Sequence, residues 1–289
     1  MKVVRPIVIT DASLVSSDVP ETDHPAWAAG TTYALGAKVI LASTHRRYES
    51  LVGANTGFNP ATNPTKWVDL GPTNRWAMFD NRVGTETSRA DSLTVELSPG
   101  SVDTLALIDT VAESATVTMT VDATVVYEGE RSFMTSGVAI NNWFAYFFEP
   151  IGMKTVALFL DLPVYPEAVV KVEVFGGGLI IGKTAELGST EQGVDIGIVD
   201  YSRKVTDDFG VTTVVERNWS KRMTARSLIL TDQVDAAQRL LASLRAQPVL
   251  WIGEEAFESM TIFGFYKDFS IDVAFPSVSY CSLTVEGLT

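Results

Sequence analysis

Short runs of apolar residues, separated by turn-forming residues, recur along most of the chain. The clearest run, Leu93 to Leu97, alternates apolar and polar side chains and is followed by Ser98-Pro99-Gly100. A period of two is typical of a β-strand with one buried face, and the Pro-Gly pair is typical of a turn. The same reasoning predicts strands over 76–79, 104–109, 115–121, 125–128, 143–148, 155–160 and 169–175. Such closely spaced strands favour an antiparallel β-sandwich.

A further group of elements begins near Glu186 and includes the clearest helix of the sequence. Thr231 is a favourable N-cap, Asp235 suits the positive end of the helix, Arg239 suits its negative end, and Pro248 stops it. The apolar positions fall on one face: Val234, Ala237, Leu240, Leu241 and Leu244. Strands are predicted around the helix over 195–200, 211–215, 226–230, 249–252, 259–264, 269–274 and 279–286. A one-sided helix among strands is expected to lie across a sheet.

Residues 25–72 have a different pattern, with many aromatic rings and almost no aliphatic runs. The stretch contains Trp27, Tyr33, Gly36, Val39, Tyr48, Pro60, Pro64 and Trp67 among small and polar residues. This order of Trp, Tyr, Gly, Tyr, Pro and Trp resembles that of the small chitin- and cellulose-type carbohydrate-binding modules. Followed by Asn74-Arg75-Trp76-Ala77-Met78-Phe79-Asp80, it is also similar to modules carried by tail proteins of tailed bacteriophages.

The resemblance implies that aromatic rings of this module stack on sugars. The residues that it nominates as glycan contacts are Trp27, Tyr48, Phe58 and Trp67. A second interpretation stays open, in which Trp27, Tyr33, Tyr48 and Trp67 form the core of the module and touch no ligand. So short a segment buries a small share of its surface, and a few large rings must then supply its interior.

Two further resemblances concern the rest of the chain. The strands of 101–108 and 115–119 resemble the jelly-roll sandwich of galactose-binding-like domains. The ending, with its helix, Pro248-Val249-Leu250-Trp251-Ile252 and Ser282-Leu283-Thr284-Val285-Glu286-Gly287, resembles C-terminal domains of phage tail-tip and baseplate components. The predicted organisation is therefore mainly β. It comprises an N-terminal arm or strand (1–24), a carbohydrate-binding-like module (25–72), a β-sandwich (73–185) and a C-terminal α+β assembly domain with one helix on a sheet (186–289).

Composition narrows the partners and the compartment. The 289 residues carry 22 basic and 35 acidic side chains, for a net charge of −13. Such a charge repels phosphate backbones and anionic lipids, so neither nucleic acid nor a membrane surface is an expected partner. Charge and proline near the start leave no apolar signal core, which predicts a protein made in the cytoplasm. With one cysteine and two histidines, neither a disulfide framework nor a usual zinc site can be built, and no cofactor is expected.

Two short segments match sequence motifs of catalytic families, but the neighbouring elements that those motifs require are not predicted. Residues 177–184 match a phosphate-binding loop that ends in Lys183-Thr184, yet no helical pattern follows, and a glycine bend between two strands is the alternative. Asp208-Phe209-Gly210 matches a kinase triplet without any other kinase element. A pair of glycosidase carboxylates has no fixed spacing and stays an open alternative. No catalytic residue is nominated.

A basic patch interleaved with aromatic character stands out on this acidic chain. It consists of Arg217, Trp219, Lys221, Arg222 and Arg226. It is interpreted either as a docking surface for an acidic neighbour, such as another copy of the protein, or as the solvated face of a strand. As the assembly interface, the residues nominated are Arg217, Trp219, Arg222 and Arg226.

The resemblances together imply a structural component of a bacteriophage tail tip or baseplate, made in the host cytoplasm and resident in the virion tail. Its expected partners are other tail proteins, further copies around the tail axis and, through the module, cell-surface polysaccharide. It is expected to act by binding and assembly rather than as an enzyme. The alternative is a polysaccharide-active enzyme or its accessory carbohydrate-binding protein.

Overall fold

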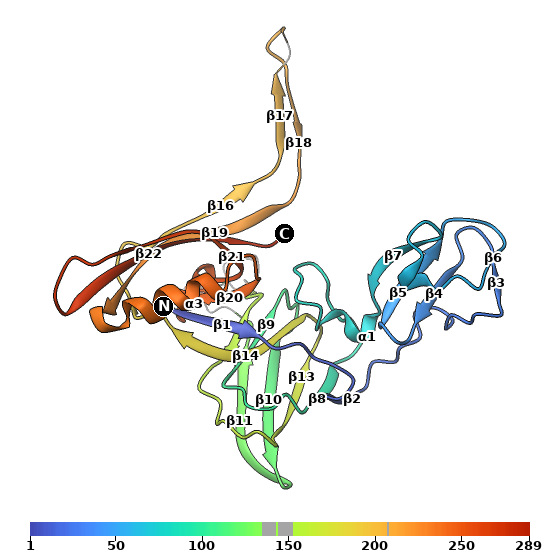
Figure 1. Cartoon of the computed structure of the whole chain (residues 1–289), viewed down its shortest axis with the longest axis horizontal. Helices are drawn as coiled ribbons and strands as arrows, with labels where there is room; N and C mark the ends of the chain where they lie inside the picture. The colour runs from blue at the N-terminus through green and yellow to red at the C-terminus, as the bar shows by residue number, and fades with distance from the viewer. Residues whose placement is uncertain (135–142, 144–152, 207) are drawn as a thin grey trace.

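The computed structural model describes residues 1–134, 143, 153–206 and 208–289. The chain is mainly β, as predicted, and most of its strands form a compact body (Figure 1). Two parts extend away from that body. One is the aromatic module, and the other is a narrow two-stranded extension, residues 201–219, which we call the projecting hairpin.

The body is built on a large antiparallel sheet. Its order is β12 (Ala157–Phe159), β9 (Thr104–Ile108), β14 (Gly178–Glu186), β1 (Lys2–Pro6), β20 (Val249–Ile252), β21 (Thr261–Asp272), β22 (Val278–Gly287), β19 (Trp219–Leu230) and β15 (Ser189–Thr190), with β16 (Asp195–Asp200) also paired to β19. The N-terminal strand β1 lies inside this sheet, where Val3 faces Ala185 on one side and Trp251 on the other. The first residues therefore join elements that are far apart in the sequence.

A second sheet covers one end of the large sheet and completes the predicted sandwich. Its order is β11 (Thr124–Ser132), β10 (Ser114–Val121), β13 (Val169–Val174), β8 (Leu93–Leu97) and β2 (Leu14–Ser17). Alternate residues point inward, so Val95 and Val117 pack in one core with Leu107 and Ile181 of the large sheet. Strands β8, β10, β11 and β13 were predicted, whereas β2 lies in the segment 1–24 that was expected to be an N-terminal arm or single strand. The strand expected over 143–148 lies, apart from Trp143, outside the described residues.

The other end of the large sheet is covered by α3 (Val234–Ser243), as predicted. Leu241 of this helix packs with Trp251 and Leu283 of the sheet. The expected N-cap at Thr231 is wrong, because Thr231 begins a 3₁₀ turn, η2 (Thr231–Gln233), and its hydroxyl contacts the Phe275 carbonyl at 3.1 Å. Another 3₁₀ turn, η3 (Glu258–Met260), precedes β21.

The aromatic module is built from β3 (Thr32–Tyr33), β4 (Lys38–Leu41), β5 (Arg46–Ser50), β6 (Asn55–Thr56), η1 (Pro60–Thr62) and β7 (Trp67–Pro72). It is followed by α1 (Asn74–Ala77), a single helical turn at the junction with the body. A buried strand was expected over 76–79, and this expectation is wrong in type, although Trp76 and Phe79 are buried. Four apolar residues do not distinguish a strand from a helical turn.

Residues 177–184, which match the phosphate-binding loop pattern, form a glycine bend followed by a strand. Gly176 and Gly177 have φ angles of 110° and 122° and join β13 to β14. A Cβ on Gly177 would lie 2.2 Å from the Thr110 hydroxyl, so the bend needs glycine for space as well as for conformation. Lys183 therefore lies on a strand, away from any helix N-terminus. The expected domain boundary at 185/186 coincides with the end of β14, and the large sheet continues across it through β1.

Candidate functional site

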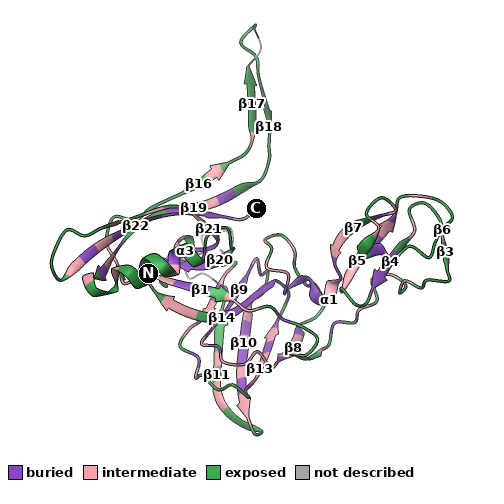
Figure 2. Ribbon diagram, viewed as in Figure 1, coloured by how far each residue is buried: buried purple, intermediate pink, exposed green. Residues whose placement is uncertain are grey.

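The projecting hairpin is formed by β17 (Arg203–Thr206) and β18 (Thr212–Val215). The strands pair in register from Arg203 opposite Val215 to Thr206 opposite Thr212, with a turn between them. β-branched residues at most of these positions favour the extended conformation. Every residue of both strands is exposed, whereas strands β8, β10 and β13 of the body have a buried residue at alternate positions (Figure 2).

Apolar side chains lie on both faces of the hairpin, with Val205 and Val215 on one face and Val214 on the other. Those exposed are Val205, Phe209, Val211, Val214 and Val215, and Phe209 is 93% exposed. A two-stranded hairpin is at best marginally stable in water, and each of its outer edges carries unpaired backbone groups. The hairpin therefore exposes apolar side chains of the kind that are found at interfaces.

A polar contact fixes the root of the hairpin to the body. The Tyr201 hydroxyl donates to a Glu286 carboxylate oxygen at 2.6 Å and lies 3.2 Å from the Ser220 hydroxyl. Lys267 donates to the other Glu286 oxygen at 3.1 Å. The hydrogen bond from Tyr201, with help from Lys267, holds the pKa of Glu286 below its ordinary value despite burial. The charged form of Glu286 thus strengthens the hydrogen bond that holds Tyr201, at the root of the hairpin, against β22.

The predicted basic patch lies on the strand that continues from this root. Arg217 and Trp219 are exposed at the end of the hairpin, where it joins β19. Arg222 and Arg226 alternate with buried Met223 and Ala225, and so point to the uncovered face of the sheet. Arg222 lies 3.5 Å from Asp195 and Lys221 lies 3.9 Å from Glu258. Arg226 is 4.0 Å from Glu191 and stacks over Tyr280. Local acids thus neutralise Lys221, Arg222 and Arg226, which weakens this strand as an electrostatic docking surface.

The four residues nominated as glycan contacts fall into two groups. Tyr48 and Trp67 are 5% and 2% exposed and form the core of the module with Val39 and Leu41. Their ring faces are occupied by protein, so they cannot serve as a platform for sugar in this conformation. Trp27 is half-buried against the same core. Phe58 is 42% exposed, with Lys66 at 5.4 Å from its ring, and is the nominated residue with an accessible ring.

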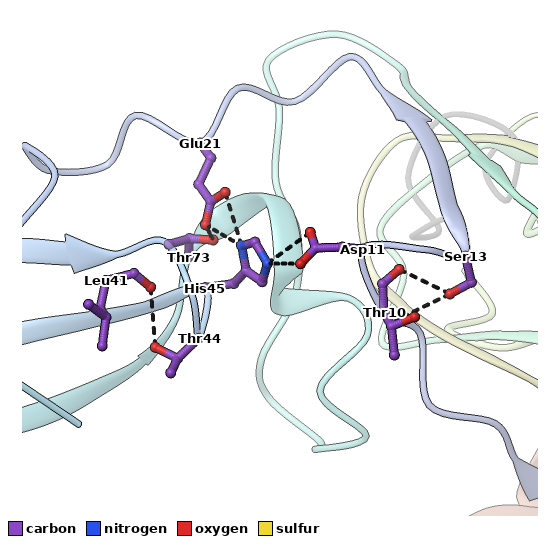
Figure 3. Close-up of polar contacts among 8 residues, drawn as sticks. All are labelled: Thr10, Asp11, Ser13, Glu21, Leu41, Thr44, His45 and Thr73. Carbon is purple, nitrogen blue, oxygen red and sulfur yellow. Dashed lines mark hydrogen bonds and ion pairs between the residues drawn. The ribbon is translucent and has the colours of Figure 1, made fainter. Parts of the chain in front are cut away.

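A histidine between two carboxylates lies where the module meets the body (Figure 3). His45 Nδ1 is 3.0 Å from Glu21, and His45 Nε2 is 3.0 Å from Asp11. Its ring stacks on Trp76 at 4.1 Å, and Thr73 donates to Glu21 at 2.9 Å. Because both ring nitrogens face acids, neither is available to a substrate. The cluster therefore acts as a structural clasp between the N-terminal segment, the module and α1, which sequence patterns did not predict.

Groups able to perform chemistry are dispersed. Among the described carboxyl groups, the pKa values of Asp200 and Glu286 are shifted, and hydrogen bonds from Ser202 and Tyr201 lower both. A glycosidase acid needs a raised pKa, so neither group suits that role. Within the described part of the chain, no cluster of metal-ligating side chains is found and no helix has the length and apolarity to cross a membrane.

No protein-family model matches the chain, and a search of curated proteins finds no significant match. The resemblances to phage tail proteins and carbohydrate-binding modules therefore stay predictions that depend on the residues quoted for them.

Sequence reasoning predicted the strand 211–215 but missed its exposure. Val211, Val214 and Val215 look like a buried strand when read as letters, because apolarity is the same signal for a core and for an interface. The available clue was the turn-rich segment 206–210, which marks a hairpin but does not say whether anything packs on it.

Proposed function

We propose that this protein is a structural component of a bacteriophage tail tip or baseplate, which acts by assembling with copies of itself and with other tail proteins. The observation that carries the proposal is the projecting hairpin, whose apolar residues are exposed on both faces. The resemblances of the module and of the C-terminal strands supply the tail context. The module is proposed to contact host polysaccharide through Phe58.

A second copy of the chain is the proposed partner of the hairpin, and charge supports it. The chain carries a net charge of −13, so two bodies repel each other. Residues 201–219 contain three basic side chains (Arg203, Lys204 and Arg217) and three acidic ones (Asp207, Asp208 and Glu216). A neutral, apolar extension that reaches beyond an acidic body can touch the next copy with less repulsion than the bodies themselves.

The test is the mass of the purified protein by light scattering over a range of concentrations. We expect oligomers, and we expect the double variant Val205→Thr, Val215→Thr to raise their dissociation constant by about tenfold or more, since 1.4 kcal/mol is tenfold. Threonine keeps the β-branched shape, and both positions are exposed in the single chain, so the monomer should lose less than about 0.5 kcal/mol.

The matched control is Val15→Thr, Val125→Thr, on edge strands β2 and β11, where both valines are 54% exposed. This control should leave the mass unchanged. A wild-type chain that stays monomeric at all concentrations would remove the main support for the proposal. Release of reducing sugar from any polysaccharide would favour the alternative of a polysaccharide-active enzyme instead.

A further inference from the structure

A groove of about 290 Å³ opens on the body, between β1, β14 and the end of α3. Its lining includes Val3, Arg5, Ile7, Lys183, Leu240 and Leu244. Along β14, Ile181 enters the sandwich core and Ala185 packs against the helix core, and Lys183 lies on the same face between them. The second sheet packs on one side of the groove and α3 packs on the other, so the groove lies between the two layers that cover this face of the large sheet.

Two cations meet in this groove. Arg5 and Lys183 are direct partners across β1 and β14, so their side chains leave the same face of the sheet. Like charges directly opposite each other are destabilising. Arg5 donates to the Ser243 hydroxyl at 2.7 Å, and the ion pairs of the described residues include neither Arg5 nor Lys183. The site therefore suits a ligand that offers an apolar group together with a negative charge.

The turn of the projecting hairpin has this chemistry. Asp208 is exposed and is followed by Phe209, which is 93% exposed. Apolar cavities of about 150 Å³ can hold a benzene ring, so the groove has room for a phenyl side chain. The turn points away from β1 and α3 of its own chain, so the occupant must come from another molecule (Figure 1).

We propose that the groove of one copy receives Asp208 and Phe209 from the hairpin turn of a second copy, with the carboxylate between Arg5 and Lys183 and the ring against Leu240 and Leu244. This inference rests on the proposed assembly function and names its contact. Because the turn and the groove are different surfaces, the contact is head-to-tail. Contacts of this kind generate closed rings or open filaments rather than two-fold dimers.

The experiment is a charge exchange in the full chain, measured by sedimentation velocity at low and high salt. Lys183→Glu and Asp208→Lys should each raise the dissociation constant by about tenfold or more, because each replaces an attraction by a repulsion. The double variant Lys183→Glu, Asp208→Lys has the net charge of the parent and restores an opposite pair. We expect it to associate within about threefold of wild type, and more weakly as salt rises.

The matched control is Arg239→Glu on the exposed side of α3, outside the groove lining, which makes the same change in net charge as Lys183→Glu. It should associate like wild type. If Lys183→Glu is no weaker than this control, or if the double variant fails to recover while circular dichroism shows it folded, the groove is not the receptor. The outcome is separable from that of the proposed function: association that depends on Val205 and Val215 but not on Lys183 overturns the groove and keeps the hairpin.

Discussion

The aromatic module and the projecting hairpin both extend from the body, but they use apolar residues in opposite ways (Figure 2). In the module, Tyr48 and Trp67 turn inward and make a core with two aliphatic residues. In the hairpin, Val205, Val214 and Phe209 turn outward and contribute to no hydrophobic core of the described chain. The module resembles a binding domain by sequence, yet the hairpin is the part whose strands expose every side chain.

The difference follows from how each part closes on itself. The module has strands on several sides, so its rings can be shielded, and Tyr33 meets Trp67 edge-to-face at 5.3 Å between centroids. A hairpin of two short strands has no third layer, so every side chain that it carries meets solvent or another molecule. A high density of aromatic residues in a small segment thus indicates a need for core before it indicates a ligand.

The largest effect is expected for Trp67→Ala, which should destabilise the module by about 3–5 kcal/mol, the usual cost of truncating a buried tryptophan. Its indole also donates to the Phe58 carbonyl at 2.9 Å, and that bond is lost too. Hydrogen exchange read by mass spectrometry should show loss of protection in residues 25–72 and not in the body. Protection that persists in the module would mean that Trp67 is not its core, and Trp219→Ala, at an exposed tryptophan, is the control.

An intermediate effect is expected at the root of the hairpin. Tyr201→Phe removes a hydrogen bond to the Glu286 carboxylate, and bonds to charged groups contribute about 1.5–3 kcal/mol. Because the pKa of Glu286 is lowered on folding, its contribution is present above the ordinary glutamate pKa and is lost as the pH falls through the lowered value. In the variant the pKa returns toward its ordinary value, so the loss should occur at a higher pH.

Thermal unfolding of wild type and Tyr201→Phe between about pH 7 and pH 3 checks this expectation. The curves should differ near neutral pH and converge in acid, where Glu286 is protonated in both proteins. Tyr165→Phe, at an exposed tyrosine, should follow wild type throughout. A constant difference between Tyr201→Phe and wild type at every pH would show that packing, rather than the charge of Glu286, stabilises the root.

The smallest effect on stability, within about 0.5 kcal/mol, is expected for Phe58→Ala, because the ring is exposed. This variant sharpens the comparison through binding instead. If the module contacts polysaccharide as proposed, glycan-array signals of the wild-type chain should fall by about tenfold in Phe58→Ala, a loss of 1.4 kcal/mol. Equal signals in the two proteins would leave the module as a spacer and would place all adhesion in the hairpin.

Local pattern was a good guide to the elements of this fold. The strands Leu93–Leu97, Asp195–Asp200 and Val249–Ile252 have the predicted bounds, since alternation or a continuous apolar run between turns is a local signal. The helical turn at Trp76 was missed because four apolar residues do not distinguish a strand from a helical turn, and its stacking partner, His45, lies elsewhere in the sequence. Pairing partners of β1 were equally invisible, because strand order is a property of the whole chain.

The candidate site was harder to predict from the sequence than the fold, for a related reason. The nominated patch, Arg217 to Arg226, was found by its charge, but Asp195, Glu191 and Glu258 neutralise much of it from neighbouring strands. Conversely, Arg5 and Lys183 are far apart in the sequence and become a cationic pair through the register of two strands. Whether a basic side chain is neutralised depends on which acidic side chains lie near it in the fold, and the sequence alone does not show these contacts.

The position of β1 also determines how late in synthesis its pairing can be completed. Its residues Val3 and Val4 are synthesised long before one of their two neighbours, β20, which begins at Val249. One edge of the nascent strand therefore stays unpaired until β20 has been synthesised. Pairings of such long sequence separation slow folding and prolong the exposure of strand edges. Yield in the cell should accordingly depend more on what shields that edge during synthesis than on the stability of the finished protein.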